Sequence, residues 1–187
     1  MTTWFIADLH LGHKGIIKHC KYPFDSVEEM NTTLIENFNK RVKDNDTVYI
    51  LGDFAWKGFD HLVYSLNGQK HYIKGNHDKN RMDQCKTAFE SMGDYKKIVI
   101  EGQVIILCHY PFREWEGMYR GSWHLHGHTH GTLCDRHSFS LDISANNIGL
   151  NPISFEELKE FFKNDQHRKD NNEQEIKYSN TVPNMEG

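Results

Sequence analysis

The sequence lacks the features that mark secreted and membrane-spanning proteins. Its four cysteines, Cys20, Cys85, Cys108 and Cys134, are far apart and form no C-x-x-C pair, so we expect neither a disulfide framework nor a thiolate zinc site. No apolar run is long enough to cross a bilayer, and no signal peptide is visible at the N-terminus. These absences predict a cytoplasmic protein without a membrane partner.

The chain also lacks an excess of positive charge. It has 22 Lys and Arg against 26 Asp and Glu in 187 residues, a formal net charge of −4. We therefore expect no stable binding to nucleic acid. A hydrophobic content of 37% suffices for the core of one domain. We place this domain at residues 1–163 and a polar tail, predicted to be disordered, at residues 164–187. The oligomeric state is left open.

Short apolar runs bounded by turn residues predict strands. Helical spacing of apolar residues, with capping-box signals at Ser26 and Ser154, predicts helices between and after them. The strands are expected at residues 3–7, 47–51, 70–74, 96–108 (broken at Gly102), 123–126 and 139–143. The helices are expected at residues 26–42, 59–66, 81–92 and 154–162. This alternation predicts an α/β fold, and the tight turn at Gly102 predicts that its sheet is mixed.

Potential metal ligands follow five of these strands directly. The strand ends run into D-L-H, G-D, G-N-H-D, a single His and G-H-T-H, and the carboxyl ends of such strands converge on one crevice. Asp, Asn and His without thiolate form a nitrogen and oxygen donor set that suits Mn, Fe, Ni or Zn. The donors are too many for one tetrahedral ion, which predicts two divalent ions about 3.5–4 Å apart. Mn is the first choice. The potential donors at these strand ends are Asp8, His10, Asp53, Asn76, His77, Asp78, His109, His128 and His130.

The stretch WHLHGHTHG places a histidine at every second position from His124 to His130. The G-H-x-H turn interrupts the alternation of a strand, so the four imidazoles need not be equivalent. We expect His128 and His130 to be ligands. His126 is expected to support a ligand or the substrate, and His124 to be structural.

The five blocks, in this order, resemble those of the calcineurin-like metallophosphoesterase superfamily, and the closest similarity is to small single-domain bacterial and phage phosphoesterases. The resemblance covers roughly the first 130 residues. It implies a four-layer α-β-β-α sandwich of two mixed sheets flanked by helices. It also implies a phosphohydrolase in which a hydroxide bridging two metals attacks the phosphate.

The resemblance assigns roles to individual positions. It implies that Asp8, His10 and His130 hold one metal, that Asn76, His109 and His128 hold the other, and that Asp53 bridges them. It implies further that His77 binds the phosphate and protonates the leaving oxygen, with Asp78 orienting its ring. A histidine can carry such a proton near neutral pH.

Other polar residues near the blocks are candidates for substrate binding. Asn76, His77 and His126 are joined by His13, Arg81, Tyr110 and Arg113. His13 and Arg81 could equally well be helix-start residues. The segment GDFAWKG lacks the Arg that protein Ser/Thr phosphatases carry after the second block, which argues against that activity.

We therefore expect a phosphodiesterase or phosphomonoesterase that acts on a small, nucleotide-like phosphate ester. A nuclease with the same metal centre is one alternative, although the acidic balance counts against it. A non-catalytic metal-bound scaffold is the other. Such a scaffold would be expected to have lost ligands or the proton donor, and none is missing here.

Overall fold

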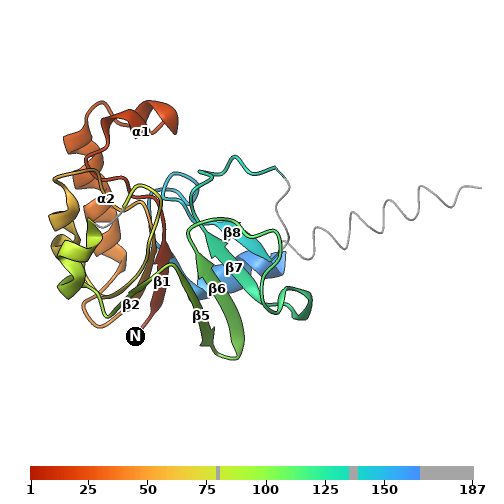
Figure 1. The fold of residues 1–187 in the computed structure, drawn as a ribbon. Coiled ribbons are helices and arrows are strands. Elements are labelled where there is room, and N and C mark those ends of the chain that lie inside the picture. Colours follow the sequence, from red (N-terminus) through yellow and green to blue (C-terminus); the bar gives the residue numbers. More distant parts are fainter. Residues whose placement is uncertain (79–80, 135–138, 165–187) are drawn as a thin grey trace, which may run out of the picture.

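The computed structural model describes residues 1–78, 81–134 and 139–164 (Figure 1). The expected disordered tail therefore lies outside the described residues, apart from its first residue. Within the described ranges, no helix is long and apolar enough to cross a membrane.

Two mixed sheets form the centre of the molecule, which confirms the expected fold class (Figure 1). The first sheet has the order β4-β3-β2-β1-β9, and its strands are parallel except for β9. The second has the order β5-β6-β7-β8, with β5 antiparallel to its neighbour. The first sheet comprises β1 (Thr3–Ile6), β2 (Thr47–Leu51), β3 (Gln69–Ile73), β4 (Ser91–Gly93) and β9 (Ile153–Ser154). The second comprises β5 (Tyr95–Ile100), β6 (Gln103–Cys108), β7 (Trp123–His126) and β8 (Ser140–Asp142).

Helices cover the face of the first sheet that points away from the second (Figure 1). The helical elements are α1 (Lys14–His19), α2 (Val27–Arg41) and the 3₁₀ helices η1 (Asp60–Ser65), η2 (Met82–Ala88) and η3 (Met118–Arg120), followed by a helix over residues 155–164. Both expected capping signals are present. Ser26 Oγ accepts from the Glu29 amide, and Ser154 Oγ accepts from the Glu157 amide.

The extent of two predicted helices needs correction. The helix expected at residues 59–66 is the 3₁₀ helix η1 (Asp60–Ser65), with Phe59 and Leu66 as its caps. The helix expected over residues 81–92 ends at Ala88, because residues 91–93 pair with the edge of β3 as strand β4. That pairing is a contact between distant segments, which local helical spacing does not encode.

The alternation of side chains along β1 and β2 divides the core into two parts. Trp4 and Ile6 of β1 pack under α2, on Leu34 and Phe38 among others. Phe5 faces the second sheet, where it packs with residues such as Leu125. Burial on both faces fixes the register of β1 and, with it, the position of the residues that follow it.

Candidate metal centre

The ends of five strands place the candidate ligands beside one another. Parallel pairing aligns the ends of β1, β2 and β3 in one sheet and those of β6 and β7 in the other. A bridge between Ala7 and Ser144 then joins the end of β1 to the segment after β8. The carboxyl ends of both sets of parallel strands thus lie at one edge of the molecule, and ligands of α/β sheets bind outside such strand ends.

Two groups of side chains in the described residues could each hold a metal ion. The first contains Asp8, His10 and His130, and the second contains Asp8, Asp53 and His109. In each group the donor atoms lie within 4.8 Å of one another. His10 Nε2 lies 3.6 Å from Asp8 Oδ1 and 3.7 Å from Asp53 Oδ2. Donor atoms that each lie about 2.0–2.2 Å from one shared ion are separated from each other by distances similar to these 3.6 and 3.7 Å.

Two donor atoms in this cluster lack any hydrogen-bond partner. Asp8 Oδ1 and His10 Nε2 are both buried, and neither has a partner among the described residues. Buried polar atoms are almost always hydrogen-bonded, so a pair of unsatisfied atoms facing one another marks a place for a cation. The residues present therefore fit a metal ion.

The second group is extended by Asn76 and His128. Asn76 Oδ1 lies 2.9 Å from both His109 Nε2 and His128 Nδ1. His109 Nδ1 is 2.9 Å from the Leu51 carbonyl, which can only accept, so Nδ1 carries a proton. His109 Nε2 faces the Asn76 oxygen, and a cation placed between them would accept a lone pair from each atom.

The electrostatic environment favours the metal-binding form of Asp8 and His128 and, without a cation, disfavours that of Asp53. Burial raises the pKa of Asp8 and the neighbouring His10 and His109 lower it, with a net value below the usual one. Burial lowers the pKa of His128, which leaves its imidazole neutral at pH 7. Burial raises the pKa of Asp53, and an adjacent cation would reverse that effect.

The backbone at the site adopts an uncommon conformation. Asp8, His10, Asp53, His128 and His130 all have φ between 47° and 67°, in the left-handed region. Non-glycine residues adopt this region at a cost, although Asp and His tolerate it better than most. Such strain gathers at functional sites, where the surrounding structure enforces it.

Glycines allow the loops to approach the carboxylates closely. A Cβ on Gly75 would lie 2.3 Å from Asp53 Oδ1, and one on Gly127 would lie 2.0 Å from Asp8 Oδ2. No other residue type leaves this space. The glycine in each of these two blocks is therefore required by packing around a ligand.

His77 lies at the exposed rim of the cluster. Its side chain is 45% exposed, with Nε2 3.9 Å from Asp53 Oδ2, while its amide donates to Asp53 Oδ1. The carboxylate of Asp78 accepts from the amides of Asp53, Phe54 and Gly75, so it ties two ligand loops together. Asp78 therefore holds the backbone of the ligand loops in position. Its expected effect on the orientation of the His77 ring stays a prediction.

Arg81 supports the same loop from outside. Its Nη2 donates to the carbonyls of Ala55 and His77, and its Nε lies 3.4 Å from Asp60 Oδ1. The guanidinium is thus engaged by protein groups. These contacts match the structural alternative for Arg81, and its binding of substrate stays a prediction.

His13 borders the site through an aromatic stack. Its ring lies parallel to the exposed Trp56, with centroids 4.3 Å apart, and 5.6 Å from the ring of His10. No local sequence pattern indicates Trp56 as a neighbour of His13, because the two are 43 positions apart.

On the opposite side, Tyr110 borders the second group of ligands. Its exposed ring lies 4.7 Å from that of His128 and 5.2 Å from that of His109. Arg113 is exposed on the segment that follows. Trp115, which belongs to the same segment, is buried and donates to Ser122 instead.

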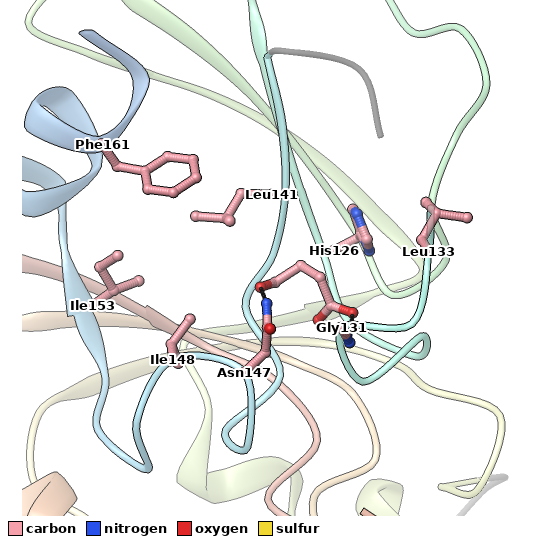
Figure 2. A pocket seen from close by; sticks show the side chains of 9 residues that line it. His126, Gly131, Leu133, Leu141, Asn147, Ile148, Ile153 and Phe161 are labelled. Carbon is pink, nitrogen blue, oxygen red and sulfur yellow. Dashed lines mark hydrogen bonds between the residues drawn. The ribbon is translucent and has the colours of Figure 1, made fainter. Parts of the chain in front are cut away.

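The two remaining histidines of WHLHGHTHG are fully buried. His124 accepts from the Phe112 amide and lies 3.2 Å from the Ile106 carbonyl, as a structural residue does. His126 lines a separate cavity of about 470 Å³, together with Leu133 on one side and Leu141, Ile153 and Phe161 on the other (Figure 2). This cavity contains none of the candidate ligands, and contact of His126 with substrate stays a prediction.

Three residues at the end of β8 or just after it hold the ligand loop in place, and the sequence analysis missed them. Asn146 Oδ1 lies 2.8 Å from His130 Nδ1, which leaves His130 Nε2 directed at Asp8. Ser144 Oγ donates to Asp8 Oδ2. Asp142 accepts from Thr129 Oγ and the Gly131 amide. The strand-end pattern that indicated the ligands recurs in D-I-S-A-N (residues 142–146), which begins within the strand predicted at residues 139–143 and runs past its end, and it could have indicated all three.

Comparisons with known proteins agree with this arrangement. The domain described as "Calcineurin-like phosphoesterase superfamily domain" matches residues 1–154. An uncharacterized protein of Methanocaldococcus jannaschii is 35% identical over 165 residues, which cover 82% of this chain and 86% of that protein. The gene 66 protein of Mycobacterium phage L5 is 27% identical over 164 residues, covering 70% of this chain and 78% of the phage protein.

A solved structure has the same architecture. A protein of unknown function from Aquifex aeolicus superposes with a TM-score of 0.69 at 27% identity, covering 85% of this chain and 98% of that chain. The similarity therefore extends over nearly the whole described fold.

Proposed function

The chain belongs to the calcineurin-like phosphoesterase superfamily and is a metal-dependent phosphoesterase. We propose that it hydrolyses a small, nucleotide-like phosphate ester at a pair of divalent metal ions. We propose further that it prefers diesters. The observation that carries the proposal is the pair of buried, unpartnered atoms, Asp8 Oδ1 and His10 Nε2, inside two overlapping groups of ligands.

Seven side chains would hold the two ions. Mn²⁺ is our first choice, and Fe, Ni and Zn suit the same donors. When bound, the ions would activate a water molecule and neutralise charge on the phosphate oxygens. We assign Asp8, His10 and His130 to one ion, Asn76, His109 and His128 to the other, and Asp53 to both.

His77 is assigned the role of general acid. It lies next to the ligand cluster and is accessible to a bound ester, so its imidazole can donate a proton to the leaving oxygen. Asp78 and Arg81 act on it through the backbone, since Asp78 fixes Gly75 and Arg81 holds the His77 carbonyl. The site thus positions the acid without burying it.

Turnover of bis(p-nitrophenyl) phosphate and p-nitrophenyl phosphate, with and without added Mn²⁺, tests the proposal. Asp53→Asn should lower turnover by more than about 100-fold, since even outer-shell changes lower it by 10–100-fold. Asp46→Asn is the matched control, because Asp46 is a buried carboxylate that bonds the amides of Thr2 and Lys43, outside the metal centre. It should lower stability and leave turnover per folded molecule unchanged. Absence of turnover by the metal-loaded protein on both esters would refute the enzymatic proposal and favour a metal-bound scaffold.

The acid role predicts a dependence on the leaving group. His77→Ala should slow hydrolysis of thymidine 5′-phenyl phosphate by about 100-fold or more and that of the 4-nitrophenyl ester much less, because nitrophenolate needs little protonation. His61→Ala, at an exposed histidine of η1, is the control and should change neither rate. Equal losses on both esters would contradict the assignment.

A further inference from the structure

A groove leads away from the candidate metal centre along the end of α1. Its first part, of about 350 Å³, contains the ligands His10 and Asp53 together with His77. Its second part, of about 450 Å³, lies between the segment after α1 and residues 129–132. Both parts are lined by His19, His128 and His130, so they form one continuous groove.

The groove continues beyond the space that a scissile phosphate would occupy at the ligands. Its far part is lined by His19, Lys21, Thr132 and Asn146. We call these four residues the Lys21 subsite. The His19 ring lies 6.4 Å from that of His130, which places the subsite directly next to a candidate ligand.

The charge of the groove differs from that of the chain as a whole. Among the described residues that line its two parts, Asp53 is the one carboxylate, and it belongs to the metal centre. The segment from Lys14 to Lys21, in contrast, contains three lysines and no acidic residue. Within the described residues Lys21 forms no ion pair. Lys21 is the one lysine among the described residues that line the groove, so it adds a positive charge there although the net charge of the chain is −4.

Lys21 has a backbone conformation that is unfavourable for a residue with a Cβ. The residue follows the C-cap Cys20 of α1 and has φ of 53°, in the left-handed region. This position after a helix is usually glycine, because a Cβ is unfavourable there. A lysine at this position keeps a charge in the groove at the expense of backbone strain.

We propose that the Lys21 subsite binds a second anionic group of the substrate, and that the preferred substrates are nucleotide-like diesters carrying a further phosphate. The inference rests on the proposed function, since it places the scissile phosphate at the ligands. The side chain of Lys21 supplies the charge and His19 a second polar group. Thr132 and Asn146 shape the groove wall, since the Thr132 hydroxyl donates to the Thr129 carbonyl and the Asn146 amide bonds His130.

Calorimetric titration of the Mn²⁺-loaded protein with thymidine 3′,5′-bisphosphate and thymidine 5′-phosphate tests the subsite without turnover. The bisphosphate should bind about fivefold more tightly, the upper range for one exposed ion pair. Lys21→Gly should abolish this preference and preserve or raise the urea midpoint, because glycine relieves the left-handed backbone. Lys18→Gln removes the same charge three residues earlier, inside α1, at a residue that does not line the groove, and it should retain the preference.

Equal affinities of the wild-type protein for the two nucleotides would overturn the inference, as would equal losses in the Lys21→Gly and Lys18→Gln variants. Hydrolysis of thymidine 5′-(4-nitrophenyl phosphate), with and without a 3′-phosphate, separates this inference from the proposed function. Turnover of both esters with equal kcat/KM would refute the subsite alone. A bisphosphate preference in binding without turnover of either ester would refute the function alone.

Discussion

Replacement of Gly127 by alanine adds one methyl group next to Asp8 and tests whether Asp8 is a ligand of the metal centre. Gly127 lies between β7 and the ligand His128, and its φ lies outside the left-handed region. Alanine can therefore adopt its backbone conformation. The added methyl, however, would lie 2.0 Å from Asp8 Oδ2 and 2.7 Å from the Cβ of Ala7. Any effect of Gly127→Ala is therefore steric.

The size of the effect follows from the contacts of Asp8. Ordinary contact begins at 3.4 Å, so Asp8 and the loop must separate by about 1.4 Å. Asp8 is fully buried, and its Oδ2 accepts from the His128 amide and from Ser144 Oγ, each at 2.9 Å. Loss of these two bonds lowers the free energy of unfolding by about 2–4 kcal/mol. A displacement of this size at a reacting centre lowers turnover by about 100-fold or more.

The assay measures Mn²⁺ affinity by calorimetry, turnover of bis(p-nitrophenyl) phosphate and unfolding in urea. Gly93→Ala is the matched control, since its methyl would meet nothing nearer than 3.6 Å. It should leave affinity and turnover unchanged. If Gly127→Ala lost stability but kept wild-type metal affinity and turnover per folded molecule, Asp8 would not be a ligand and the assignment of the site would fail.

Three further predictions concern stability and loop support. Burial lowers the pKa of His124 to about 4 from its usual 6.5, so between these pH values the unfolded chain binds a proton at His124 and the folded chain does not. Urea titrations in EDTA should therefore show that the free energy of unfolding falls by about 2 kcal/mol from pH 7 to pH 5. The fall should be smaller in His124→Gln. Asp142→Asn puts an amide donor opposite donors of Thr129 and Gly131, and should weaken Mn²⁺ binding about 10–100-fold in calorimetry. Ser26→Ala removes the cap of α2 and should lower the free energy of unfolding by about 1 kcal/mol without change in turnover.

The positions of the candidate ligands followed from the sequence because two local signals coincide there. Buried strands are marked by short β-branched and aromatic runs, and polar residues at their ends stand out against them. The structure brings Asp8, His10, Asp53, His109 and His130 together as expected, although their binding of metal stays a prediction. Parallel pairing of the strands aligns the ends that carry these residues and so brings the side chains together.

Features that depend on contacts between distant segments could not be predicted in this way. Met82 and Cys85 have helical spacing, but the pairing of Ser91 and Met92 with β3 ends the helix early. The stack of His13 on Trp56 joins two loops whose approach is set by the bridge between Leu11 and Ala55. No local pattern in the sequence contains this information.

The left-handed backbone of the ligands shows why a sequence can indicate such a site but not its geometry. The sequence pattern indicates Asp and His as ligands because of their donor atoms. It does not indicate that these residues adopt positive φ, although both tolerate it better than most. Five such residues in strained conformations persist only because buried bonds fix the loops, such as that of Asp78 to the Asp53 amide and that of Ser144 to Asp8. These bonds are made by protein groups, and a metal ion at the site would satisfy the buried Asp8 Oδ1 and His10 Nε2. Metal binding should accordingly raise the thermal midpoint without ordering new secondary structure.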